Sequence, residues 1–206
     1  MIDGLDRRNI DGETGLATRG AQVYGEPTAE GWRLWDRSRS KLAVLLDRGV
    51  ETGLEGGSTV LYLGAASGTT VSHVADFAGP TYAVEFAPRP MRDLLDVAAD
   101  RPNLFPLLKD AREPATYAHI VEPVDVIVQD VAIRGQADVA LTNRRFLRDD
   151  GRLVLSVKAR SEDVTRDPRA VFEDVRARLE EGYEIEYAES LEPFHDDHLG
   201  IVAAPK

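Results

Sequence analysis

Three charged side chains stand at the ends of apolar runs of the sequence. Glu85 closes the run 81–85, Asp130 follows 124–129, and Lys158 closes 151–158. A carboxylate in such a place can accept hydrogen bonds from sugar hydroxyls, and a lysine held beside a carboxylate can orient a hydroxyl group or, once deprotonated, accept its proton. We predict that Asp130 and Lys158 lie side by side. An ordinary surface ion pair, worth about 0–1 kcal/mol, explains the spacing equally well.

A glycine-bearing turn precedes these residues, in the segment Leu-Tyr-Leu-Gly-Ala-Ala-Ser-Gly-Thr-Thr-Val at 61–71. Gly64 and Gly68 allow the backbone to turn sharply and to approach a ligand closely, and Thr69 and Thr70 can cap the helix that follows. The Gly-x-x-x-Gly spacing lacks the middle glycine that a dinucleotide pyrophosphate requires. It is compatible with a cofactor without phosphate, such as S-adenosylmethionine; a tight turn with no ligand is the alternative.

Alternating strands and helices must position these residues. Short apolar runs predict strands at 59–63, 81–86, 104–108, 124–130 and 151–158. Amphipathic or Pro- and Gly-bounded segments predict helices at 69–77, 90–99, 136–147 and 168–181. Two further strands, 183–190 and 198–204, have no helix between them and should pair antiparallel. We therefore expect an α/β fold with the Rossmann-like sheet of class I S-adenosylmethionine-dependent methyltransferases, in which the last of seven strands is antiparallel.

The N-terminal part has a different character. Residues 1–28 are polar and rich in glycine, and the apolar spacing between Trp32 and Gly49 predicts a helix over the second half of that stretch. We therefore divide the chain into a short N-terminal extension, 1–28, and one methyltransferase-like domain, 29–206.

The composition limits the possible classes of protein. The formal net charge is −11, which argues against binding nucleic acid through the protein's own bulk field. In strong salt, however, the Debye length falls to about 3 Å, so an acidic surface from a salt-loving organism need not repel RNA. Only four residues are lysines, which fits that habitat or a GC-rich coding bias equally well. Cysteine is absent and no apolar run approaches a membrane span, so we expect no metal site and a soluble, cytoplasmic protein.

Further strand ends suggest cofactor contacts, because ligands of open α/β sheets bind at the carboxyl ends of the strands. Glu85 lies 21 residues beyond Gly64, which suits an acceptor for two ribose hydroxyls. Asp110 follows the strand 104–108 and can accept from an adenine amino group. Either residue could instead be an exposed carboxylate. Gln129 and Asp130 end an apolar strand, and we expect them to face the site rather than solvent.

As a set, these residues resemble a known family. The chain is similar to the archaeal fibrillarins, the 2′-O-methyltransferases of box C/D ribonucleoproteins, from about Leu16 to the C-terminus. The resemblance rests on seven ordered blocks: Val-Tyr-Gly-Glu at 23–26, Arg-Ser-Lys-Leu at 39–42, the glycine turn at 61–70, Val-Glu-Phe-Ala-Pro-Arg at 84–89, Val-Asp-Val-Ile-Val-Gln-Asp-Val-Ala at 124–132, Val-Lys-Ala-Arg-Ser at 157–161, and Glu-Pro-Phe-His-Asp-Asp-His at 192–198.

The resemblance implies roles for individual residues. The family's catalytic tetrad falls on Lys41, Asp130, Lys158 and His198, with Lys158 as the proton acceptor or hydroxyl-orienting group, Asp130 as its electrostatic partner, and the other two as supports for the ribose. His195 is expected to be a loop residue. S-adenosylmethionine is the implied cofactor, and its expected contacts are Gly64, Ala66, Ser67, Gly68, Thr69, Thr70, Glu85, Phe86, Asp110, Ala111 and Asp130.

The resemblance also implies a reaction and partners. We expect ribose 2′-O-methylation of rRNA, and of tRNA, directed by a box C/D guide RNA. The implied protein partners are a Nop-domain scaffold and, indirectly, a kink-turn-binding protein of ribosomal type. Ile133-Arg-Gly135 departs from the family's usual Gln-Pro, so no contact is transferred there. A methyltransferase for protein or small-molecule substrates and a non-catalytic assembly subunit remain alternatives.

Overall fold

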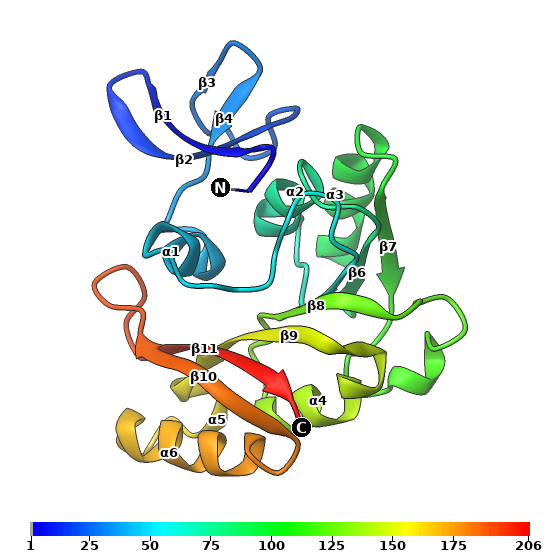
Figure 1. The fold of residues 1–206 in the computed structure, drawn as a ribbon, viewed down its shortest axis with the longest axis vertical. Helices are drawn as coiled ribbons and strands as arrows, with labels where there is room; N and C mark the ends of the chain where they lie inside the picture. Colours follow the sequence, from blue (N-terminus) through cyan, green and yellow to red (C-terminus); the bar gives the residue numbers. More distant parts are fainter. Residues whose placement is uncertain (1) are drawn as a thin grey trace.

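The larger of the two β-sheets has the strand order β10–β11–β9–β8–β5–β6–β7 (Figure 1). The computed structural model describes residues 2–206. Strands β5 to β9 pair in parallel, and β11 lies antiparallel to both β9 and β10. The predicted seven-stranded α/β sheet with its antiparallel strand is therefore confirmed. In chain order its strands are β5 (Val60–Leu63), β6 (Thr81–Glu85), β7 (Leu104–Leu108), β8 (Val124–Gln129), β9 (Leu147–Lys158), β10 (Tyr183–Ser190) and β11 (His198–Pro205).

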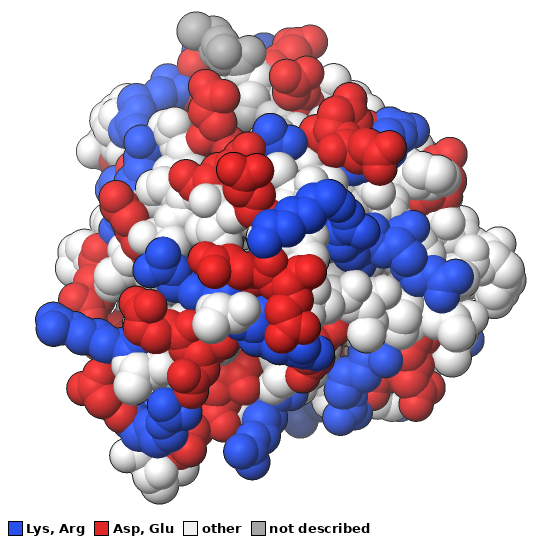
Figure 2. Space-filling view, turned by 60° about the horizontal axis from the view of Figure 1, so that its bottom comes forward, with Lys and Arg blue, Asp and Glu red and all other residues white. Residues whose placement is uncertain are grey.

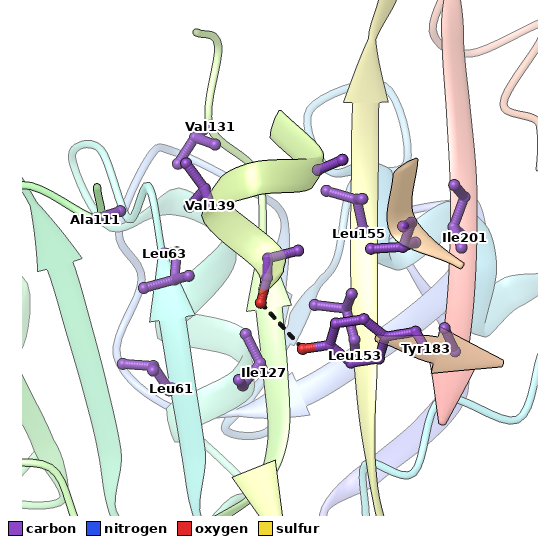
Figure 3. Close-up of a cluster of buried hydrophobic side chains, with 14 of the residues drawn as sticks. Leu61, Leu63, Ala111, Ile127, Val131, Val139, Leu153, Leu155, Tyr183 and Ile201 are labelled. Atoms are coloured by element: carbon purple, nitrogen blue, oxygen red, sulfur yellow. Dashed lines mark hydrogen bonds between the residues drawn. The ribbon is translucent and has the colours of Figure 1, made fainter. Parts of the chain in front are cut away.

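Helices cover both faces of this sheet, which is why its central strands are apolar on both sides. One core contains α1, α2 and α3, and the other contains α4 and α6. Figure 3 shows the second core, where Leu61, Ile127 and Leu153 line one face of the sheet and the Tyr183 hydroxyl donates to the Ala140 carbonyl, 3.1 Å away. The helices are α1 (Lys41–Asp47), α2 (Thr69–Ala75), α3 (Pro88–Ala99), α4 (Gln136–Asn143), α5 (Ala159–Glu162) and α6 (Pro168–Leu179), with single 3₁₀ turns at Pro114–Thr116 and Arg144–Phe146.

The predicted junction between the helix that begins at residue 136 and the strand that follows it was wrong. The helix expected to reach residue 147 ends at Asn143, because a 3₁₀ turn follows it and β9 already begins at Leu147. The helix expected between Trp32 and Gly49 occupies only its second half, as predicted, in α1. Within residues 2–206, no helix is long and apolar enough to cross a membrane.

A second sheet precedes this domain, where the sequence pattern had indicated no strand. Its four antiparallel strands have the order β1–β2–β4–β3 and the bounds β1 (Leu5–Ile10), β2 (Glu13–Arg19), β3 (Thr28–Ala29) and β4 (Trp32–Leu34). Asp11 and Gly12 both have positive φ, 53° and 87°, as a two-residue hairpin turn of type I′ requires. The domain boundary after residue 28 stays a prediction; it falls within β3, and β4 lies wholly beyond it.

A buried polar network fastens the smaller sheet to α2. The Arg33 guanidinium, fully buried, donates to Glu26 at 2.6 Å, to Asp76 at 2.7 Å and to the Ser72 hydroxyl at 2.8 Å. Glu26 also accepts from the backbone N–H of Tyr24 at 2.8 Å. The Val-Tyr-Gly-Glu block at 23–26 therefore has a structural role. Through Glu26 and Arg33 it holds the smaller sheet against α2, the helix that begins directly after the glycine turn.

His73 on α2 lies at the centre of the same network. Trp35 stacks on its ring at 4.8 Å, and its nitrogens contact the hydroxyls of Thr18, at 2.7 Å, and Tyr24, at 3.0 Å. The Thr18 hydroxyl donates to Asp76, so it accepts from Nδ1–H of His73, and the Tyr24 hydroxyl can donate to Nε2. Burial, together with the charges of Arg33 and Arg101, lowers the pKa of His73 well below its usual value.

Candidate active site

The glycine turn is fitted closely to the end of the neighbouring strand. Gly64 has a φ of 85°, and a Cβ added there would press on the carbonyl oxygen of Asp130 and lie 2.9 Å from its carbonyl carbon. Gly68, with a φ of 95°, precedes α2, and its Cβ would lie 3.1 Å from Val97. Ala66 between them has a φ of 48°. Gly64 is therefore required for conformation and for space, and Gly68 for conformation.

Glu85 connects this turn to the end of β6. Its Oε2 accepts from the backbone N–H of Ala66 at 2.9 Å, and its Oε1 accepts from that of Ala87 at 2.8 Å. An ionised carboxylate has about four acceptor positions, so each oxygen of this buried group keeps one for a ligand hydroxyl. Phe86 follows directly and is 64% exposed, which leaves its ring accessible beside the turn.

Asp110 and Ala111 lie just beyond β7. The Asp110 carboxylate accepts from the Nε of Arg112 at 3.0 Å, and this contact lowers the pKa of Asp110. Ala111 is buried, and its carbonyl accepts from the side-chain amide of Asn143 at 2.8 Å. Asn143 of α4 thus holds the loop in place. The contact between Asp110 and Arg112 was not indicated by the sequence.

Lys41 and Asp130 form an ion pair at the carboxyl edge of the sheet, with Nζ 2.9 Å from Oδ2. Both side chains are about a quarter exposed. The pair borders a cavity of about 320 Å³ whose remaining lining comes from the glycine turn, Tyr62, Arg39 and the first residues of α2, Thr69 and Thr70. Burial and the Asp130 charge raise the pKa of Tyr62, which stays a neutral phenol in the cavity wall.

The prediction that Asp130 is the partner of Lys158 is wrong. Gln129 lies opposite Leu155 in the parallel pair β8 and β9, so Lys158 stands two residues beyond the level of Asp130. At about 3.3 Å per residue this offset is roughly 7 Å. Lys41 on α1 reaches Asp130 instead. Among the carboxylates of residues 2–206, none lies within 4 Å of the Lys158 ammonium, so this cation has no ion-pair partner there.

Lys158 and His198 are neighbours on adjacent strands, since they are paired residues of the antiparallel strands β9 and β11. The His198 Nδ1 lies 2.7 Å from the carbonyl oxygen of Asp196. A carbonyl can only accept, so Nδ1 carries the hydrogen, and Nε2 of the neutral ring is an acceptor. Burial lowers the pKa of His198, and the Lys41 charge acts in the same direction. At neutral pH this imidazole is a hydrogen-bond acceptor.

A family model described as Fibrillarin matches residues 7–206. The chain belongs to the fibrillarin family. Fibrillarin-like rRNA/tRNA 2′-O-methyltransferases from two halophilic archaea are similar to it over nearly all of both chains. The Halorubrum lacusprofundi protein is 69% identical, over 98% of this chain and 96% of its own. The Haloarcula marismortui protein is 66% identical, over 100% of this chain and 98% of its own.

Solved fibrillarin structures have the same fold. The fibrillarin of a fibrillarin/Nop5p complex superposes with a TM-score of 0.91 at 40% identity, over 100% of this chain and 99% of its own. Aeropyrum pernix fibrillarin, with natively bound S-adenosyl-L-methionine, has a TM-score of 0.87 at 43% identity, over 98% of this chain and 95% of its own. A TehB-like S-adenosylmethionine-dependent methyltransferase at 20% identity, with a TM-score of 0.58, shows the shared fold alone.

One residue near this fibrillarin-family site, Gln129, differs from what the sequence indicated. Gln129 does not face the cavity; it is fully buried and donates to the backbone carbonyl of Gln136 at 2.7 Å. His195 lies in the turn before β11, as expected, but its ring centroid is only 5.8 Å from that of His198. The one sequence signal for this proximity is the three-residue spacing of the two histidines.

Proposed function

We propose that this chain catalyses 2′-O-methylation of ribose in rRNA and tRNA, with S-adenosylmethionine as the methyl donor. Its family and its relatives' names support the reaction. The observation that carries the proposal is the Lys41–Asp130 ion pair beside the cavity of the glycine turn. It joins a cofactor cradle to fixed charged groups at one edge of the sheet.

The residues around the turn fit this cofactor. Gly64, Ala66, Ser67 and Gly68 give a backbone without bulky side chains, and Thr69 and Thr70 line the helix start. Glu85 keeps acceptor positions for the two ribose hydroxyls of the cofactor, and the exposed Phe86 ring can cover its base. We assign recognition of the base amino group to the loop of Asp110 and Ala111. The bound cofactor supplies an electrophilic methyl group on a sulfonium.

Four charged or polar side chains have separate roles toward the substrate ribose: Lys41, Asp130, Lys158 and His198. Asp130 holds the Lys41 ammonium in an ion pair, and this pair forms the side of the site against which the ribose binds. Lys158 has no carboxylate partner among the described residues, so it is free to orient the 2′-hydroxyl and, once deprotonated, to accept its proton. The neutral His198, opposite Lys158, offers an acceptor for a second hydroxyl. Alignment of the attacking oxygen is the main contribution that the protein makes.

RNA affinity comes from partners rather than from this chain. The net charge is −11, and Figure 2 shows acidic and basic side chains interspersed over the face that it presents, without a broad field of either sign. Such a surface binds RNA weakly. We therefore propose that a Nop-domain scaffold, a kink-turn-binding protein and a box C/D guide RNA deliver the target. The fibrillarin/Nop5p complex of a relative supports the scaffold.

Lys158→Ala tests this assignment in particles reconstituted with scaffold, kink-turn protein and guide RNA. Cofactor affinity should stay within about twofold, and transfer at saturating cofactor and RNA should fall by 10²-fold or more, the usual contribution of a positioned acid or base. Arg169→Ala, which removes an exposed cation on α6, is the control for loss of one positive charge. Retained turnover in Lys158→Ala would refute the role given to Lys158.

A further inference from the structure

The turn between β10 and β11, residues 191–197, is fastened to α1 and to the segment before it. Arg48, directly after α1, donates from its two terminal nitrogens to the carbonyls of Ser190, at 2.6 Å, and Glu192, at 2.7 Å. The Arg37 guanidinium lies 4.8 Å above the Phe194 ring and is held there by Asp47, at 2.6 Å. These contacts join two parts of the chain that are about 150 residues apart.

His195 makes the contact nearest to the active site. Its Nε2 lies 2.9 Å from the carbonyl oxygen of Arg37, so Nε2 carries the hydrogen and donates it. Arg37 precedes Lys41 by four residues, and His195 precedes His198 by three. One hydrogen bond thus connects the segment that leads to Lys41 with the turn that leads to His198, the first residue of β11.

The surroundings of His195 keep it in the donating neutral form. Its ring is half-buried, with a centroid 5.8 Å from that of His198. Burial is the largest influence on its pKa, which is lowered; Lys41 adds to this, while Asp130 and the backbone carbonyls of Arg37 and Ser40 oppose it. The groups that face His195 are therefore those of the site itself, from α1, from the end of β8 and from β11.

We propose that His195 is a positioning residue for methyl transfer, whose hydrogen bond to the Arg37 carbonyl sets the distance between Lys41 and His198. The inference rests on the proposed function. Arg48 and Phe194 hold the turn near α1 without His195, so loss of the His195 side chain should leave the fold intact. It should remove the hydrogen bond to the Arg37 carbonyl, the contact of the turn that lies nearest to the site. Misplacement of a catalytic group by about 1 Å can cost up to about 10²-fold in rate.

Three variants test this in the reconstituted particle. His195→Ala should lower the single-turnover rate at saturating cofactor and RNA about tenfold, the equivalent of one hydrogen bond, and leave the cofactor dissociation constant within about twofold. In His195→Gln an amide nitrogen takes the place of Nε2, so the rate should return to within about threefold of wild type. His119→Ala, which removes an exposed histidine before β8, should not change either quantity.

A wild-type rate in His195→Ala, or an equal loss in both His195 variants, would overturn the proposal while wild-type transfer to ribose still supports the proposed function. Absence of any wild-type transfer would overturn the proposed function instead. Imidazole ¹⁵N spectra decide the geometry independently of activity. The Nδ1-protonated neutral tautomer of His198 should be lost or become mixed in His195→Ala and be kept in His195→Gln. An unchanged His198 signal in His195→Ala would overturn the positioning role.

Discussion

Gly64→Ala perturbs the closest approach between the glycine turn and the end of β8. The added Cβ would press on the Asp130 carbonyl oxygen and lie 3.0 Å from a Val131 methyl group, and the residue would also have to keep a φ of 85°. The backbone N–H of Asp130 donates to the Leu63 carbonyl at 2.9 Å, so this part of the strand has little freedom to retreat. The substitution should therefore displace the Asp130 carboxylate together with its partner Lys41.

Two terms contribute to the cost, and a control separates them. A positive φ costs an L-residue about 1–2 kcal/mol, and overpacking costs about 1–3 kcal/mol more. Gly12 has nearly the same φ, 87°, and nothing within 4 Å of an added Cβ. Gly12→Ala should lose only the first term. We therefore expect the free energy of unfolding to fall by about 2–5 kcal/mol in Gly64→Ala and by about 1–2 kcal/mol in Gly12→Ala.

The assays are denaturant unfolding and calorimetric titration with S-adenosylmethionine. Gly64→Ala should weaken cofactor affinity more than tenfold, whereas Gly12→Ala should leave it unchanged. Equal destabilisation by the two substitutions, with unchanged cofactor affinity in both, would show that the turn does not depend on contact with Asp130.

Three further perturbations address the ion pair and the buried network. Asp130→Asn should lower single-turnover transfer about 10²-fold, and adding Lys41→Ala should cost little more, because the two residues act as a unit; multiplicative losses would contradict this. Glu26→Gln removes one charge from the buried pair with Arg33 and should lower the free energy of unfolding by about 3 kcal/mol or more, measured by denaturant unfolding; a change below 1 kcal/mol would show the pair to be dispensable. Because folding lowers the pKa of His73, the stabilisation that depends on its neutral form is lost as the pH falls below about 6.5. The unfolding free energy of the wild type should fall by about 1 kcal/mol between pH 6.5 and 5.5 through this residue, and His73→Gln should remove that loss.

The large sheet was predictable because each of its units carries its own signal. Strands β5, β6 and β8 are short apolar runs that end in a turn or a polar residue, and such runs predict buried parallel strands without knowledge of their neighbours. The antiparallel end followed from the missing helix between β10 and β11. The strand ends by themselves indicate Glu85, Asp110, Asp130 and Lys158, without the family resemblance.

The remaining features depend on relations between distant segments. Register between β8 and β9 decides that Asp130 meets Lys41 rather than Lys158, and no residue in either strand signals a two-residue offset. Strands β3 and β4 are two and three residues long, too short for a periodic pattern, although Asp11-Gly12 was an available hairpin signal. The contact of His195 with the Arg37 carbonyl spans 158 residues of sequence.

Transfer of a deuterated methyl group tests the central claim most directly. The reconstituted particle is supplied with S-adenosylmethionine that carries a CD₃ group, and the nucleotide selected by the guide RNA is examined by mass spectrometry. We predict one CD₃ group on the ribose 2′-oxygen of that nucleotide in the wild type and its loss in Lys158→Ala. Label on a base or on a protein side chain, or no label while the cofactor binds, would contradict the account.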